Sequence, residues 1–313
     1  MSKKFLVGLD GSTLAESVLP YAETLARATD ATLVLTRVVP PTVDPGIDPG
    51  LVVAAIADAE AYLAAVARRI PARGKPIAIE TAVTAGYPAE TLLEESQLRH
   101  CDLILLTTHG RSGLGRLLYG SVAESVLARS DVPVLLVRAS GGIADQAPHA
   151  ALPRLLVPLD GSRFAEAALP VASDLARALA SELQVIRVVP PPTAWSRAES
   201  DGVQSVAEEA ADEDEYAAAE YLDFVVESLR GGGIHATRAV WVDRPAPGIA
   251  AAATALGSEL IVMATHGRTG LARALLGSVA LAVLHHVGVP ILFVRPPRSD
   301  GTSWDPDRVL AEA

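Results

Sequence analysis

Two short motifs carry side chains suited to bind a phosphorylated sugar. Asp10-Gly11-Ser12 follows an apolar run, and Asp160-Gly161-Ser162 follows a matching run. An aspartate at this position can accept a hydrogen bond from a ribose hydroxyl, and the glycine lets the backbone approach a ligand at a helix N-terminus. The same residues can also simply form a turn and cap a helix, so the motif alone leaves both interpretations open.

A longer pattern, also present twice, places a Gly-Ser pair at an expected helix start. Thr107-Thr108-His109-Gly110 is followed by nine residues and Gly120-Ser121, and Ala264-Thr265-His266-Gly267 by nine residues and Gly277-Ser278. A helix start presents unpaired backbone N–H groups and the positive end of the helix dipole, and the serine adds a hydroxyl. We therefore expect this pattern to hold phosphate oxygens.

Arginines inside both nine-residue segments add positive charge near the expected phosphates. A guanidinium can pair with phosphate oxygens, although ordinary surface arginines look the same in a sequence. Both interpretations stay open for Arg111 and Arg116 in the first segment and for Arg268 and Arg273 in the second.

Short apolar runs alternate with longer helical patterns around these motifs. Runs that are apolar on both faces are typical of buried parallel strands, and the alternation predicts a doubly wound α/β sheet. Ligands of such sheets bind beyond the carboxyl ends of the strands, so the loops after the first and fourth strands should form the site. The strands expected in the first copy are Lys4–Leu9, Thr32–Val39, Ile77–Val83, Leu103–Thr107 and Val134–Arg138, and the helices are Leu14–Thr29, Val52–Arg69, Pro88–Leu98 and Ser121–Ala128.

The whole pattern is repeated, which predicts two tandem domains of one fold. Segment 6–28 matches 156–178 at an offset of 150 residues, and 108–127 matches 265–284 at an offset of 157. The second copy is therefore seven residues longer, and its acidic segment 199–215 is expected to belong to a longer helix with a solvated face. We place the first domain at 1–138, a linker at 139–153, the second domain at 154–296 and a tail at 297–313.

The composition of the 313-residue chain argues against several kinds of partner. Half of the residues are hydrophobic, and a formal net charge of −11 with only three lysines provides no basic stripe for nucleic acid or an anionic membrane. The single cysteine, Cys101, excludes an intramolecular disulfide, and we find neither a signal-peptide pattern nor an uninterrupted apolar stretch of about 20 residues. We therefore expect a soluble, cytoplasmic protein in which Cys101 is a buried apolar group.

An aspartate after the first strand, combined with a Gly-x2-Gly-x9-Gly-Ser/Thr pattern after the fourth, resembles the ATP-binding branch of the universal stress protein family. The resemblance covers nearly all of 3–138 and 154–295. It implies, for each domain, a five-stranded parallel sheet in the order 3-2-1-4-5, with adenine held by main-chain groups after the second strand. It also implies that the aspartate contacts ribose and that the glycines and serine contact the phosphates.

Carried onto this sequence, the resemblance gives one set of candidate ATP-binding residues for each domain. The sequence departs from the family pattern where Thr107 and Ala264 replace the first glycine, which adds a side chain where the backbone should pass close to the nucleotide. The first set is Asp10, Gly11, Ser12, Val38, Thr107, His109, Gly110, Arg111, Gly120 and Ser121. The second is Asp160, Gly161, Ser162, Val188, Ala264, His266, Gly267, Arg268, Gly277 and Ser278.

The function expected from these sites is that of a stress-response regulator whose state or partners depend on bound ATP, with Mg²⁺ or Mn²⁺ held only through the phosphates. Fast phosphoryl transfer is disfavoured, because GxxxxGK[ST] is absent, no lysine follows Lys75 and neither nine-residue segment contains a carboxylate. His109 and His266 are expected to be turn residues. Two alternatives remain open, namely a slow ATPase and an interaction protein whose pockets are vestigial.

The last strand of each copy should lie at the edge of its sheet, where an apolar strand must be covered or paired. In the family that the sequence resembles, these strands pair between subunits. We therefore predict that the two halves pack on each other through Val134–Arg138 and Pro290–Val294, with a homodimer of the whole chain as a further option.

Overall fold

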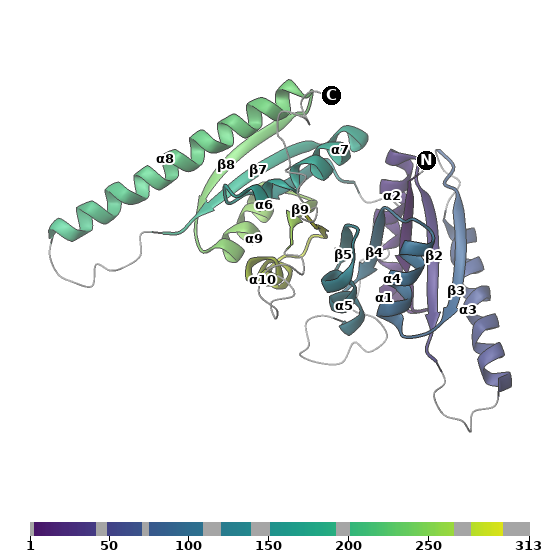
Figure 1. Ribbon diagram of the computed structural model, residues 1–313. Helices are drawn as coiled ribbons and strands as arrows, with labels where there is room; N and C mark the ends of the chain where they lie inside the picture. Colours follow the sequence, from purple (N-terminus) through teal and green to yellow (C-terminus); the bar gives the residue numbers. More distant parts are fainter. Residues whose placement is uncertain are drawn as a thin grey trace, which may run out of the picture. The chain divides into compact units, whose positions relative to one another are not determined.

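A computed structural model describes residues 3–41, 49–70, 75–108, 120–138, 151–191, 201–265 and 277–296 (Figure 1). The chain divides into two compact units. The first consists of Met1–Ala151 with Pro290–Phe293, and the second of Leu152–Val289 with Val294–Ala313.

The first unit has the predicted α/β architecture. Its parallel strands follow the order β3-β2-β1-β4-β5, and Val7 of β1 lies opposite Leu35 of β2 and Leu105 of β4. The predicted order is therefore confirmed in this half. The elements are β1 (Lys4–Gly8), α1 (Thr13–Glu16), α2 (Leu19–Thr29), β2 (Thr32–Val39), α3 (Pro49–Arg69), β3 (Ile79–Ala85), α4 (Pro88–Leu98), β4 (Leu103–Thr107), α5 (Ser121–Arg129) and β5 (Val134–Val137).

The second unit repeats this arrangement, with parallel strands in the order β8-β7-β6-β9. Its helix α8 packs on β7 and β8, and its first turns extend beyond the sheet (Figure 1). At 31 residues α8 is longer than the 21-residue α3, so the predicted lengthening is confirmed, and the acidic side chains at 212–215 are exposed. The elements are β6 (Arg154–Pro158), α6 (Arg163–Glu166), α7 (Leu169–Leu179), β7 (Glu182–Val189), α8 (Asp201–Gly231), β8 (Ala236–Val242), α9 (Pro245–Ala255), β9 (Leu260–Ala264) and α10 (Ser278–His286).

A further strand, β10 (Ile291–Val294), contributes its first residues to the first unit. There Ile291 lies opposite Leu136 and Phe293 opposite Val134 in an antiparallel pair with β5. Packing of the two halves on each other stays a prediction.

The first predicted helix is in fact two helices, and proline explains the break. We expected one helix over Leu14–Thr29, but α1 ends at Glu16 and α2 begins at Leu19. Pro20 has no N–H to donate to the carbonyl four residues earlier, so it fits only in the first turn of a new helix. Pro170 has the same place at the start of α7.

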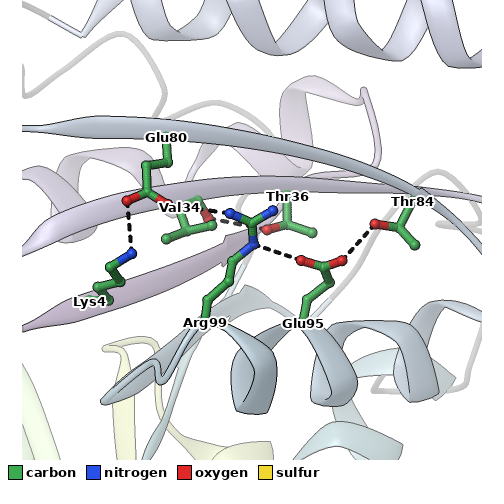
Figure 2. A network of polar contacts seen from close by, with 7 residues as sticks. All are labelled: Lys4, Val34, Thr36, Glu80, Thr84, Glu95 and Arg99. Carbon is green, nitrogen blue, oxygen red and sulfur yellow. Dashed lines mark hydrogen bonds and ion pairs between the residues drawn. The ribbon is translucent and has the colours of Figure 1, made fainter.

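A polar network crosses the first unit between α4 and the strands it covers (Figure 2). Arg99, the C-cap residue of α4, pairs with Glu95 at 2.7 Å and with Glu80 of β3 at 3.3 Å. Lys4 of β1 also pairs with Glu80, and Thr84 donates to Glu95 at 2.8 Å. The matching positions of the second unit carry Arg154, Thr237, Trp241, Ala252 and Leu256, so the two repeats fill equivalent space differently.

Helix α3 also bears on the prediction that no segment spans a membrane. The helical segment Gly50–Arg69 is long and apolar enough to cross a membrane, and only 17% of its most apolar 18-residue stretch is buried. One such helix is weak support for a membrane span, because it rests on length and composition alone. Here Ala59, Leu63 and Val66 are buried, whereas Asp58 and Glu60 are exposed, as on an amphipathic surface helix.

Candidate functional site

Both Asp-Gly-Ser motifs form the same turn at the end of a central strand. Ser162 donates to Oδ1 of Asp160 from its backbone N at 2.9 Å and from its hydroxyl at 2.5 Å. The Ser162 hydroxyl in turn accepts from the backbone N of Ala165 at 3.1 Å and caps α6. Ser12 makes the equivalent contacts with Asp10 and caps α1. The turn-and-cap role is therefore confirmed, and in the second unit these bonds use only Oδ1 of the aspartate.

The glycine of each turn has a backbone conformation that other residues rarely adopt. The φ angle is +89° at Gly11 and +82° at Gly161. A side chain there would also meet an arginine, because an added Cβ would lie 3.0 Å from the guanidinium of Arg37 or 3.3 Å from that of Arg187. Glycine thus suits the positive φ of the turn, and any side chain there would also require the arginine to shift.

The two Gly-Ser pairs lie at helix starts, as predicted. Gly120 and Gly277 are the N-cap residues of α5 and α10, and neither helix has a side-chain cap. Glycine has no side chain to cap the first N–H groups, and a helix start of this kind suits an anionic ligand. Gly120 is closely packed, since an added Cβ would lie 3.1 Å from the carbonyl oxygen of Thr108.

In the second unit, predicted residues from distant parts of the sequence line one cavity of about 230 Å³. The cavity lies beyond the carboxyl ends of β6, β7 and β9 and beside the start of α10, where an α/β sheet binds ligands. Its volume suits part of a nucleotide, since sites for whole drug-sized ligands measure about 300–1,000 Å³. The predicted residues on its wall are Asp160, Val188, Ala264, Gly277 and Ser278.

The apolar part of the cavity wall was not predicted. Phe164 of α6, Pro245 and Ile249 of α9 and Met263 of β9 supply it. Apolar side chains with a few polar groups are typical of nucleotide and other small-molecule sites. The sequence signal was weak, because these residues fit an ordinary helix or strand core.

In the first unit, the described candidate residues occupy the matching places. Asp10, Gly11 and Ser12 follow β1, Val38 lies in β2, Thr107 ends β4, and Gly120 and Ser121 begin α5. Six candidates lie outside the described residues: His109, Gly110, Arg111, His266, Gly267 and Arg268. Arg116 and Arg273 also lie outside them.

The structure reveals a polar cluster that the sequence analysis missed, and it occurs in both units. The guanidinium carbon of Arg187 lies 5.6 Å from the ring centroid of Tyr221, whose hydroxyl donates to Glu166 at 2.8 Å. In the first unit Arg37 lies 5.0 Å from the ring centroid of Tyr62. Burial chiefly, and then the neighbouring glutamate, raise the pKa of each tyrosine above its ordinary value. The signal was the recurrence of Arg37 and Arg187 in the repeated RVVPP segment.

Comparison with known proteins identifies the family. The Universal stress protein family model matches residues 1–138 and 152–295. The chain belongs to the universal stress protein family. Among curated universal stress proteins, one from Mycobacterium tuberculosis is 31% identical over 222 residues, which cover 71% of this chain and 70% of that protein. One from Mycolicibacterium smegmatis is 27% identical, covering 93% of this chain and 96% of the relative.

A solved structure supports the same fold for this universal stress protein. A universal stress protein from Archaeoglobus fulgidus superposes with a TM-score of 0.72 at 24% identity, covering 95% of this chain and all of the other. Family membership and the tandem α/β fold are thus established, as the sequence predicted.

Proposed function

We propose that this universal stress protein binds ATP at one site in each repeat and acts as a regulator whose state or partners depend on the bound nucleotide. One observation carries the proposal. Asp160, Val188, Gly277 and Ser278, which are far apart in the sequence, line one cavity at the carboxyl end of the sheet. A pocket with a carboxylate on one side and a glycine-started helix on the other matches a sugar phosphate.

Each part of the nucleotide has a partner in the proposed complex. Adenine would contact main-chain groups near Val188 and the apolar wall, and ribose hydroxyls would donate to Oδ2 of Asp160. The phosphates would accept hydrogen bonds from the first N–H groups of α10 and from the hydroxyl of Ser278. A metal ion would be held through the phosphates, because among the described residues no group of three His, Cys, Asp or Glu could hold one.

A second candidate function is that of an interaction protein with a vestigial pocket. It is favoured by Ala264, whose side chain lies on the cavity wall where the family pattern has glycine, and by Thr107 at the matching position. An added methyl group narrows the space but leaves the helix start and Asp160 in place, so we favour binding. A cytoplasmic location remains part of the proposal.

Mass spectrometry of small molecules released from the denatured, freshly purified protein tests the proposal, followed by calorimetric titration of the stripped protein with ATP. We expect ATP to bind, and we expect Gly120→Val with Gly277→Val to abolish binding, because a branched side chain would block each helix start. Gly288→Val is the matched control, since an added Cβ at Gly288 meets nothing within 4 Å. A stripped protein that fails to bind ATP would favour the vestigial pocket.

The aspartates should contribute less than the helix starts. Asp10→Ala with Asp160→Ala is expected to weaken ATP binding by about 1–3 kcal/mol, the usual cost of losing hydrogen bonds to a charged group. Loss of all binding in this variant would show that the turns themselves had collapsed.

A further inference from the structure

The Asp-Gly-Ser turn of the second unit lies between two different environments. Consecutive strand residues point to opposite faces of a sheet, and β7 shows this directly. Val188 lies on the wall of the cavity with Ile249 of α9, whereas Arg187 contacts Tyr221 of α8. The turn that carries Asp160 thus has the proposed nucleotide on one side and Arg187 on the other.

A closed ring of contacts joins this turn to the long helix α8. The Arg187 guanidinium lies against Gly161, where an added Cβ would come within 3.3 Å of it. Arg187 lies over the ring of Tyr221, the Tyr221 hydroxyl donates to Glu166, and Glu166 ends the helix that Ser162 caps. The ring thus connects the turn, α6, β7 and α8.

The charged groups of this ring also influence the pKa of Tyr221. The pKa of Tyr221 is raised chiefly by burial and also by the charges of Glu166 and Asp160, whereas the charge of Arg187 lowers it. Asp160 and Arg187 therefore lie close enough to Tyr221 to act on the same hydroxyl. The guanidinium is a fixed positive charge over the Tyr221 ring.

The first unit contains the matching arginine–tyrosine contact, so this contact is not an accident of one repeat, but the Tyr62 hydroxyl has no hydrogen-bond partner among the described residues. Arg37 lies against Gly11 and over Tyr62. Glu16 lies close enough to raise the pKa of Tyr62 and also pairs with Arg69 at 2.8 Å.

From this geometry we propose that Arg187, and Arg37 in the first repeat, are positioning residues that orient the turn aspartate toward the ribose hydroxyls of the nucleotide. This inference rests on the proposed ATP-binding function. The guanidinium fills the space behind the turn and is itself held by the tyrosine of the long helix. It acts through Asp160 and needs no contact with the nucleotide. The two interactions are thermodynamically linked. If the contact between α8 and Arg187 increases the affinity for ribose by some factor, ribose binding must strengthen that contact by the same factor.

The test compares ATP with 2′,3′-dideoxy-ATP, because only the former offers ribose hydroxyls to Asp160. Gly120→Val serves as background, so that the second site alone is measured by calorimetry. We expect the parent to prefer ATP by about tenfold or more, as hydrogen bonds to a charged group allow. In Arg187→Met the preference should fall to about twofold, with the affinity for dideoxy-ATP unchanged.

Arg238→Met is the matched control. Arg238 lies on the neighbouring strand β8 and holds the same helix through two bonds to Asp223, at 2.5 and 2.7 Å. It should keep the full preference for ATP, which separates positioning of the turn from general attachment of α8. If Arg187→Met does not fold, Arg187→Lys replaces it, because lysine keeps the charge but lacks the planar group that lies over Tyr221. Its preference should fall below that of the parent.

The outcomes separate the two proposals. If the parent does not bind ATP, the proposed function fails and this inference fails with it. If the parent prefers ATP and the Arg187 variant keeps that preference, or loses affinity for both nucleotides equally, the positioning role alone is overturned.

Discussion

Position 161 requires a residue without a side chain for two separable reasons, the positive φ angle and the contact with Arg187. Gly161→Ala should destabilise the second unit by more than the roughly 1–2 kcal/mol that a left-handed backbone costs an ordinary residue. Gly233→Ala is the control, since Gly233 has a φ of +74° but an added Cβ there meets nothing within 4 Å. Urea unfolding followed by tryptophan fluorescence measures both variants, since all three tryptophans of the chain lie after residue 194, in the second half of the sequence.

The difference between the two glycine variants should vanish when Arg187→Met is added to each, because the contact has then been removed. Equal destabilisation by Gly161→Ala and Gly233→Ala in the parent would show that Arg187 yields to the methyl group at no cost.

Cys101 is expected to be chemically inert in the folded protein. It is 5% exposed, and burial is the main cause that raises its pKa to about 11. Since the thiolate is the reactive form, about one thiol in a thousand would be ionised at pH 8. A disulfide reagent should therefore react with Cys101 of the native protein far more slowly than it reacts with the thiol of reduced glutathione. The same reagent should label the urea-unfolded protein fully. Native labelling at the glutathione rate would contradict this account.

At the scale of elements, the polar network of the first unit should make its stability depend on pH. Burial alone would raise the pKa of Glu95, but hydrogen bonds from Arg99 and Thr84 outweigh it and hold the pKa below its ordinary value of 4.5. The network therefore stabilises the fold above about pH 4.5, and this contribution is lost as the pH falls through the lower folded-state pKa.

Arg99→Met should reverse the sign of this dependence. The variant leaves Glu95, which is 9% exposed, without its cation, and at pH 7 we expect a loss of about 3 kcal/mol. Burial would then dominate and raise the Glu95 pKa, so the variant should regain stability as the pH falls from 7 toward 5, while the parent does not. Hydrogen exchange of peptides from β3 and α4 measures this, with Arg129→Met, which breaks an exposed pair with Glu90, as the control that should change nothing.

The elements that could be predicted are those whose signal is local. Apolar runs such as Leu103–Thr107 gave β4 at its observed bounds, because a strand buried on both faces leaves a continuous apolar run. The third strand was expected at Ile77–Val83 but lies at Ile79–Ala85, where only Ala82 is buried and the other residues are half-buried or exposed, so that no apolar run marks its ends. The break before α2 required the backbone chemistry of Pro20 to be weighed against a continuous helical pattern.

The candidate site divides in the same way. Asp160, Gly277 and Ser278 could be predicted because each belongs to a short motif at an element boundary. Arg187 could not be predicted, because its role depends on contacts with Tyr221 and Gly161, which are distant in the sequence and lie next to it only in the folded domain. An arginine in a strand carries no sequence signal of what lies across from it.

At the scale of the whole molecule, duplication preserves the motif residues while the surroundings diverge. The Asp-Gly-Ser turn and the arginine–tyrosine contact recur in both units. The hydroxyl groups differ, because that of Tyr221 donates to Glu166, whereas that of Tyr62 has no hydrogen-bond partner among the described residues. The ion network of the first unit is replaced by Trp241, Ala252 and Leu256 in the second. The parts closest to the proposed nucleotide have thus changed least, as expected if the site rather than the core is under the tighter physical constraint.

The whole chain should also bind ATP without consuming it rapidly. Phosphoryl transfer requires an attacking group held in line with the leaving oxygen and groups that stabilise charge on the transferred phosphoryl. Among the described residues, Asp160 is the only carboxylate on the cavity wall of the second unit, and its Oδ1 is already engaged by Ser162. The helix start and Ser278 would contact ground-state phosphates, and binding without extra stabilisation of the transition state gives affinity without rate.

Single-turnover hydrolysis of radiolabelled ATP in the presence of Mg²⁺ or Mn²⁺ measures this directly. We expect a rate constant well below the roughly 1–100 s⁻¹ of ordinary kinases. Whatever slow turnover is seen should disappear in Gly120→Val with Gly277→Val and persist in Gly288→Val, because only the former blocks the helix starts that would hold the phosphates. A rate constant within the kinase range that depended on Gly120 and Gly277 would make the protein an enzyme, and would require a catalytic group that neither Asp160 nor Ser278 supplies.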